Sequence, residues 1–185
     1  MQELSMNVLD IAQNSVDAGA SLIQISLCIA TAQKRMTLTI ADNGRGMPAE
    51  FAARVTDPFC TSRTSRRVGL GLPFLKMAAE LTGGSLSLES EPGKGTRVCA
   101  VFTLGHIDLA PLGDMSSTVS GLIQCNPTLD FVYTVEADGE RFCADTRQLR
   151  EVLEGVSLAE PEIALWVRDY LQENTYHLLQ RSNAV

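Results

Sequence analysis

The sequence of 185 residues lacks the features of a membrane, exported or nucleic-acid-coating protein. Its longest stretch without a charged residue, 18–33, contains Gln24, Ser26 and Thr31, so it is too short and too polar to span a bilayer. The N-terminus has no basic region followed by an apolar run, which is the pattern of a secretory signal. A formal net charge of −7 disfavours a protein that coats nucleic acid. These absences predict a cytoplasmic protein with neither a membrane nor a nucleic acid as its partner.

Cysteines are few, and their spacing forms no recognisable pair. The sequence has five, an odd number, and no two are separated by two residues as in a metal-binding or redox pair. Scattered cysteines of this kind are typical of a reducing compartment rather than of a disulfide framework or a zinc site.

Charge divides the chain into two parts near Gly105. Residues 1–104 contain ten basic and nine acidic side chains, whereas residues 105–185 contain five basic and thirteen acidic ones. We therefore predict a first domain over 1–104 and a small acidic α+β unit over 105–185, with a regulatory or partner-binding role.

The spacing of apolar residues in the first part predicts a mixed α/β fold. Helices are expected over 2–17, 50–55 and 73–81, and strands over 23–29, 36–40, 86–88 and 98–104. Apolar and polar residues alternate along the strands, so one face of each should be buried and the other less so. The expected fold class is α/β: a two-layer α/β sandwich with a mostly antiparallel sheet and helices on one face.

The second part combines helices with a hairpin. We expect a helix near 115–123, strands over 131–135 and 141–144 joined by Asp138-Gly139, and a helix over 146–153. A further amphipathic helix follows Pro161. Its apolar stripe either packs on its own hairpin, which is the commoner case, or docks a partner.

Four clusters rich in Gly, Asn and Asp stand in order along the chain. They are Asp10-x-x-x-Asn14-x-x-Asp17-Ala18, Asp42-Asn43-Gly44-Arg45-Gly46-Met47, Gly69-Leu70-Gly71-Leu72 and Gly93-Lys94-Gly95-Thr96. Each alone is common in turns and caps, but together in this order they are a strong signal. The first cluster, with Asn7, lines one side of the helix expected over 2–17. Short oxygen-bearing side chains are poor helix formers, so this side favours an ion or phosphate site over a merely solvated face.

The second and fourth clusters suit a purine base. Asp42 directly follows a strand and could accept a hydrogen bond from an exocyclic amine such as that of adenine. Gly44 and Gly46 would let the backbone pass close to a flat base. Thr96 could supply a hydroxyl group near that base.

The first and third clusters suit phosphates with a metal ion. Gly69 and Gly71 come just before a helix, where amide N–H groups favour an anion. Asn14 offers an oxygen to Mg²⁺, which usually shares the phosphates of a nucleotide. Asp10 lies one helical turn before Asn14 and could orient a water or hydroxyl nucleophile.

With these clusters, the chain resembles the GHKL superfamily of ATP-binding domains, the Bergerat fold. That superfamily includes the catalytic domain of sensor histidine kinases, DNA gyrase B, the mismatch-repair ATPase and the anti-sigma-factor kinases. The resemblance covers about residues 2–104. The stretch 42–104 is most similar to histidine kinases, and the helix near 8–20 to the mismatch-repair and gyrase type. The resemblance implies that the chain binds ATP and Mg²⁺.

The resemblance also implies roles for individual positions. Asn14 would ligate Mg²⁺, and Asp42 would bind the adenine amino group, with Asp17, Gly44 and Thr96 completing the ATP site. Gly46, Met47 and Leu72 would line the base pocket, Gly69, Leu70 and Gly71 would cap the phosphates, and a lid over 57–68 would carry Arg63, Arg66 and Arg67. These arginines could reach a phosphate or a partner, and plain solubility is an equal alternative for them.

Two departures from the superfamily bear on the activity. The hydrolytic members carry Glu where this chain has Asp10, whose reach is one methylene shorter. Histidine kinases have a dimerising hairpin with the phospho-accepting histidine before this domain, whereas the first cluster here begins close to Met1. We therefore expect any phosphorylation to act on another protein.

Three functions remain open at this point. The leading hypothesis is a protein kinase that transfers the γ-phosphate of ATP to a partner protein. The alternatives are an ATP-dependent sensor or switch, similar to the anti-sigma factors, and a slow ATPase that uses Asp10. The segments 111–115 and 130–133 also resemble stand-alone ATP-binding proteins associated with iron-only hydrogenases, which would imply a regulatory or maturation partner.

Overall fold

The computed structural model describes residues 3–56 and 71–181. Its helices and strands are α1 (Leu4–Asp17), β1 (Leu22–Ala30), η1 (Thr31–Gln33), β2 (Arg35–Asp42), α2 (Ala49–Ala52), α3 (Gly71–Leu81), β3 (Ser85–Glu91), β4 (Gly95–Thr103), α4 (Met115–Cys125), β5 (Asp130–Ala137), β6 (Glu140–Asp145), α5 (Thr146–Val152) and α6 (Pro161–Arg181). All the helices and strands predicted from periodicity are present, with bounds shifted by a few residues.

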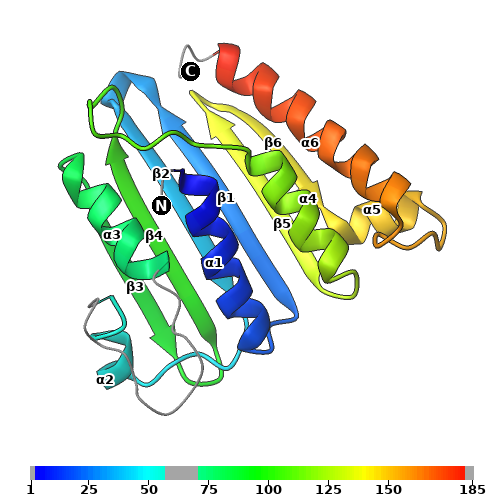
Figure 1. Cartoon of the computed structure of the whole chain (residues 1–185), viewed down its shortest axis with the longest axis horizontal. Helices are drawn as coiled ribbons and strands as arrows, with labels where there is room; N and C mark the ends of the chain where they lie inside the picture. The colour runs from blue at the N-terminus through cyan, green and yellow to red at the C-terminus, as the bar shows by residue number, and fades with distance from the viewer. Residues whose placement is uncertain (1–2, 57–70, 182–185) are drawn as a thin grey trace.

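One six-stranded sheet organises the molecule, in the order β3-β4-β2-β1-β5-β6. Neighbouring strands are antiparallel except β1 and β5, which run parallel. Figure 1 shows α1, α3 and α4 side by side across one face of this sheet, with α6 along its β6 end. The predicted α/β sandwich, mostly antiparallel with helices on one face, is confirmed.

The core lies between the sheet and these helices. Alternate residues of β1 and β2, such as Ile25, Leu27 and Leu38, are almost completely buried against α1. On the helix side, Leu4, Val8 and other residues spaced at three or four positions face the sheet. The opposite sides of the same strands stay partly exposed, as the alternation predicts.

The C-terminal residues continue the sheet of the N-terminal ones. β5 lies beside β1, where Ile23 pairs with Phe131. The Asp138 carboxylate accepts hydrogen bonds from the N–H and hydroxyl of Thr31, at 2.9 and 2.6 Å. Buried residues from both parts form one hydrophobic core. The boundary near residue 105 stays a prediction. Residues beyond it share the sheet and the hydrophobic core of the first part.

Helix α6 packs within its own part of the chain. Its residues Val167 and Leu171 are buried, and Tyr170 meets the ring of Phe142 from β6 edge-on. The first of the two alternatives for its apolar stripe therefore holds for these side chains. Trp166 stacks on Tyr170 and remains 45% exposed. Over residues 3–56 and 71–181, no helix is long and apolar enough to cross a membrane.

Candidate functional site

The carboxylate of Asp42 is held at the end of β2. Ser15 on α1 donates its hydroxyl to Oδ2 at 2.7 Å, and the N–H of Gly44 donates to Oδ1 at 2.9 Å. Asp42 remains partly exposed, and each carboxylate oxygen can accept more than one hydrogen bond. The group is thus fixed in direction by two donors and still able to accept a hydrogen bond from a ligand.

Ser90 connects Met47 with Thr96, the residue that pairs with Asp42. Thr96 on β4 pairs with Asp42 on one side and with Ser90 on the other. The hydroxyl oxygen of Ser90 accepts from the N–H of Met47 at 2.8 Å and lies 2.9 Å from that of Thr96. Three predicted site residues, Asp42, Met47 and Thr96, therefore lie together beside the C-terminal half of α1.

The glycines of the second and fourth clusters let backbone pack on backbone. A Cβ on Gly46, whose φ is +64°, would lie 2.0 Å from the carbonyl oxygen of Glu91. A Cβ on Gly95 would lie 1.9 Å from that of Asp42, and one on Gly44 would lie 3.0 Å from Ala18. The crowding at these glycines is with the protein's own chain, and their approach to a flat base stays a prediction.

The polar side of α1 runs from Asp42 to the start of α3. Asp10 and Asn14 are both partly exposed there. A Cβ on Gly71, the first residue of α3, would lie 2.7 Å from the Cβ of Asp10, so the two elements touch. Asp17, at the end of α1, is exposed, and its recorded partner is the amide of Gln13 at 3.4 Å. The structure thus brings Asp10 and Asn14 between Asp42 and α3, and places Asp17 at the outer end.

Asn7 departs from the predicted row of solvated or ligand-binding groups. It is buried, and its amide nitrogen donates to the carbonyl oxygen of Gly71 at 3.2 Å. The physical reason is the contact between α1 and α3, which removes this position from solvent. Asn7 therefore joins the two elements instead of facing a ligand.

Of the predicted site residues between 63 and 72, the structure describes Gly71 and Leu72. Leu72 on α3 is 6% exposed and packs into the hydrophobic core. Gly69, Leu70, Arg63, Arg66 and Arg67 lie outside the described residues.

Sequence reasoning missed two hydroxyl groups of this site. Ser15 lies by helical spacing on the apolar side of α1, and its local sequence gives no sign of its partner Asp42, which is 27 residues away. Ser90 continues the alternation of Leu86 and Leu88 along β3, so this alternation could have placed it on the helix side of the sheet.

Within residues 3–56 and 71–181, no group of three or more His, Cys, Asp or Glu side chains could hold a metal ion. Asn14 supplies one amide oxygen one helical turn from Asp10, and Mg²⁺ commonly takes one or two protein ligands together with substrate phosphates. The residues present therefore fit an ion that arrives with a nucleotide.

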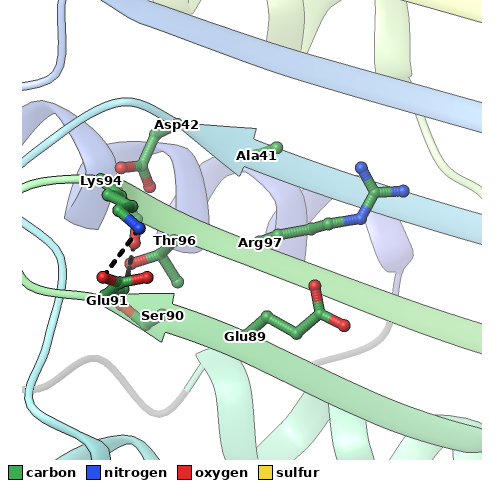
Figure 2. Close-up of a pocket in the computed structure, with 9 residues that line it drawn as sticks. Ala41, Asp42, Glu89, Ser90, Glu91, Lys94, Thr96 and Arg97 are labelled. Atoms are coloured by element: carbon green, nitrogen blue, oxygen red, sulfur yellow. Dashed lines mark hydrogen bonds and ion pairs between the residues drawn. The ribbon is translucent and has the colours of Figure 1, made fainter.

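A depression of about 300 Å³ lies over the ends of β2, β3 and β4. Figure 2 shows its lining, which includes the charged side chains of Glu89, Lys94 and Arg97, with Lys94 bridging to Glu91 at 2.8 Å. Glu89 and Arg97 pair across β3 and β4 one residue away from Ser90 and Thr96, hence on the opposite face of the sheet. The depression therefore shares Asp42, Ser90 and Thr96 with the site described above, and its charged side chains Glu89 and Arg97 extend it toward the opposite face.

Comparison with known proteins identifies the family. A family model described as "Histidine kinase-, DNA gyrase B-, and HSP90-like ATPase" matches residues 1–107, more than half of the chain. The chain belongs to this ATPase family. The predicted GHKL resemblance is thereby confirmed, and membership supports ATP binding.

The relatives of this GHKL chain include sensor kinases. It is 30% identical to sporulation kinase D of Bacillus subtilis over 91 residues, 49% of this chain and 18% of that protein. It is 35% identical to the sensor protein kinase FleS of Pseudomonas aeruginosa over 105 residues, 57% of this chain and 25% of that protein. The chain thus spans a quarter or less of these two relatives, and their whole-protein activities do not transfer with the match.

A solved structure shares the fold. The crystal structure of the N-terminal domain of a DNA repair protein superposes with a TM-score of 0.57 at 16% identity, covering 77% of this chain and 52% of that one. The likeness concerns the fold alone. The finer resemblance to hydrogenase-associated proteins stays a prediction.

Proposed function

We propose that this GHKL chain binds Mg-ATP along α1, with the base at Asp42 and the phosphates at the start of α3. The observation that carries the proposal is the Asp42 carboxylate, fixed by Ser15 and Gly44 yet partly exposed beside Met47 and Thr96. A carboxylate accepts hydrogen bonds only, so it selects a base that presents an amine, as adenine does.

Each predicted residue then has a task. Asp42 accepts a hydrogen bond from the amino group of adenine, next to Met47 and Thr96. The N-terminus of α3 at Gly71 favours phosphate through its N–H groups and helix dipole. Asn14 contributes an amide oxygen to Mg²⁺, which when bound neutralises charge on the phosphates.

The proposed reaction is transfer of the γ-phosphate to a partner protein. A nucleophilic atom of the partner attacks the γ-phosphorus, the bond to the bridging oxygen breaks, and ADP leaves with the negative charge. Asp10, beside Gly71, would accept the proton of a hydroxyl nucleophile, whereas a histidine acceptor needs no such base. The sensor kinases among the relatives support this choice of reaction.

The second candidate is an ATP-dependent switch, and slow ATP hydrolysis that uses Asp10 is a third. The switch is favoured by Asp10, whose side chain is one methylene shorter than the Glu of hydrolytic members. In that case the bound nucleotide would alter a partner surface without phosphoryl transfer.

Labelled ATP distinguishes the candidates. The purified protein is incubated with Mg²⁺ and γ-labelled ATP, with and without lysate, and free phosphate is separated from labelled protein. Label on a protein is the expected result, and its acid stability would tell a Ser or Thr acceptor from a His acceptor. Release of free phosphate alone would contradict the kinase and support the ATPase. If neither labelled protein nor free phosphate formed, the result would support the switch.

A further inference from the structure

The first turn of α1 is capped by a segment that lies beyond the family match. The residue before the helix, Glu3, makes no side-chain capping hydrogen bond. Instead, the N–H of Leu4 donates to the carbonyl oxygen of Pro111 and that of Ser5 donates to Leu112, both at 2.9 Å. The first N–H groups of a helix have no partner within it, so these two bonds fix where α1 begins. The matched residues end at 107, and the cap comes from 111–112.

Gly113 closes this segment onto α1. Its φ is +74°, and a Cβ there would lie 2.3 Å from the hydroxyl of Ser5 and 2.9 Å from the Cβ of Glu3. The segment then runs into α4, whose first turn is capped by the Asp114 carboxylate accepting from the N–H of Ser117 at 2.8 Å. Since α4 itself packs against α1, the cap is anchored in the C-terminal part of the chain.

The two halves of α1 serve different ends of the candidate site. The N-terminal half touches the start of α3, through the buried bond from Asn7 to Gly71 and the close packing of Asp10 on Gly71. The C-terminal half holds the Asp42 carboxylate through Ser15. A displacement of the first turn of α1 would therefore disturb the phosphate end of the site more than the base end.

We propose that residues 111–113 position the phosphate end of the nucleotide site by fixing the first turn of α1. This inference rests on the proposed function, because it takes the start of α3 as the place of the phosphates. It assigns a task to the C-terminal part of the chain. A partner that bound there could tighten or loosen the hold on the phosphates without touching the nucleotide.

Two glycine variants of the full chain test the proposal. Gly113→Ala forces a Cβ against Glu3 and Ser5, whereas Gly105→Ala, in the same connection and at φ +77°, meets nothing within 4 Å. Both variants carry the cost of a left-handed alanine, so the control isolates the contact with α1. Dissociation constants for Mg-ATP and for adenosine are measured by calorimetry at a temperature where circular dichroism shows each variant folded.

We expect the variant to affect the two ligands differently. Gly113→Ala should weaken the binding of Mg-ATP by about tenfold, within the range for coupled sites, and change the affinity for adenosine by less than about twofold. Gly105→Ala should change neither. If Gly113 had only a structural role, the substitution would change neither dissociation constant, or would change both by the same factor. Either outcome in a folded variant would overturn the inference.

A measurement on the wild-type chain covers the case in which Gly113→Ala does not fold. Coupling is reciprocal, so Mg-ATP should slow hydrogen exchange at the N–H groups of Leu4 and Ser5, and adenosine should slow it less. Equal exchange with both ligands would overturn the inference alone. A wild-type chain that bound neither ligand would overturn the proposed function, and the inference with it.

Discussion

Ser15→Ala removes one of the two donors that hold the Asp42 carboxylate. The Ser15 side chain is buried, at 3% exposure, and its hydroxyl lies 2.7 Å from Oδ2 of Asp42, while Oδ1 keeps its bond from Gly44. A hydrogen bond to a charged group contributes about 1.5 kcal/mol or more. Water can replace part of it here because Asp42 is partly exposed, so we expect about 1 kcal/mol less stability.

The same change should weaken nucleotide binding. With one donor gone, the carboxylate must be ordered again by the ligand, and a cost of about 1.4 kcal/mol corresponds to a tenfold larger dissociation constant for Mg-ATP. Because the defect is at the adenine amine, the preference for ATP over inosine triphosphate, which lacks that amine, should also fall. Calorimetry gives both affinities, and urea unfolding gives the stability.

Ser120→Ala is the matched control. Ser120 is also a buried helical serine, 7% exposed, and its hydroxyl donates to the carbonyl of Ala164 at 3.4 Å, far in sequence from the candidate site. The Ser120→Ala variant should be somewhat less stable than wild type and should bind Mg-ATP with unchanged affinity. If Ser15→Ala and Ser120→Ala bind Mg-ATP equally well, the assignment of Asp42 to the base is wrong.

Three further changes probe the metal, the chemistry and the C-terminal part. Asn14→Ala should abolish the Mg²⁺ dependence of ATP affinity, and an unchanged Mg²⁺ effect in calorimetry would exclude it as a ligand. Asp10→Asn should spare binding and stop turnover of labelled ATP, whereas retained turnover would show that Asp10 is not the base. Asp114→Ala should cost about 1 kcal/mol in urea unfolding at pH 7, because it removes the cap of α4. Hydrogen bonds from Ser117 hold the pKa of Asp114 below its ordinary value of 3.8, so its contribution is present above that pH and lost as pH falls through the lowered pKa. Wild type and Asp114→Ala should therefore converge in stability as the pH falls below the lowered pKa of Asp114, and a difference that persisted there would refute the carboxylate cap.

Local sequence patterns predict most of the helices and strands. The alternation of Ile23, Ile25 and Leu27 predicts a half-buried strand because side chains alternate faces, and β1 is one. Asp138 and Gly139 both have positive φ, as the turn between β5 and β6 requires. What the patterns could not give was the partner of each strand. Nothing in the alternation of β5 says that it pairs parallel to β1, because that contact joins residues more than a hundred positions apart.

The site divides in the same way. Asp42 and Asn14 are marked by short clusters with fixed spacing, and their roles toward a nucleotide stay predictions. The contacts of Asn7 and Ser15 could not be predicted, since Asn7 is buried by α3 and Ser15 meets a carboxylate from β2. The cap from Pro111 was equally hidden, because a backbone carbonyl leaves no mark on the sequence.

The most direct test of the account compares wild type with Asp42→Asn in Mg-ATP. At about one hundred times its dissociation constant, the nucleotide should raise the free energy of unfolding of the wild-type chain by about 2.7 kcal/mol. Asn at this position presents an amide in place of one acceptor oxygen, so the variant should lose most of that increase at the same nucleotide concentration. An equal increase in both proteins would contradict the central claim that Asp42 holds the adenine of bound ATP.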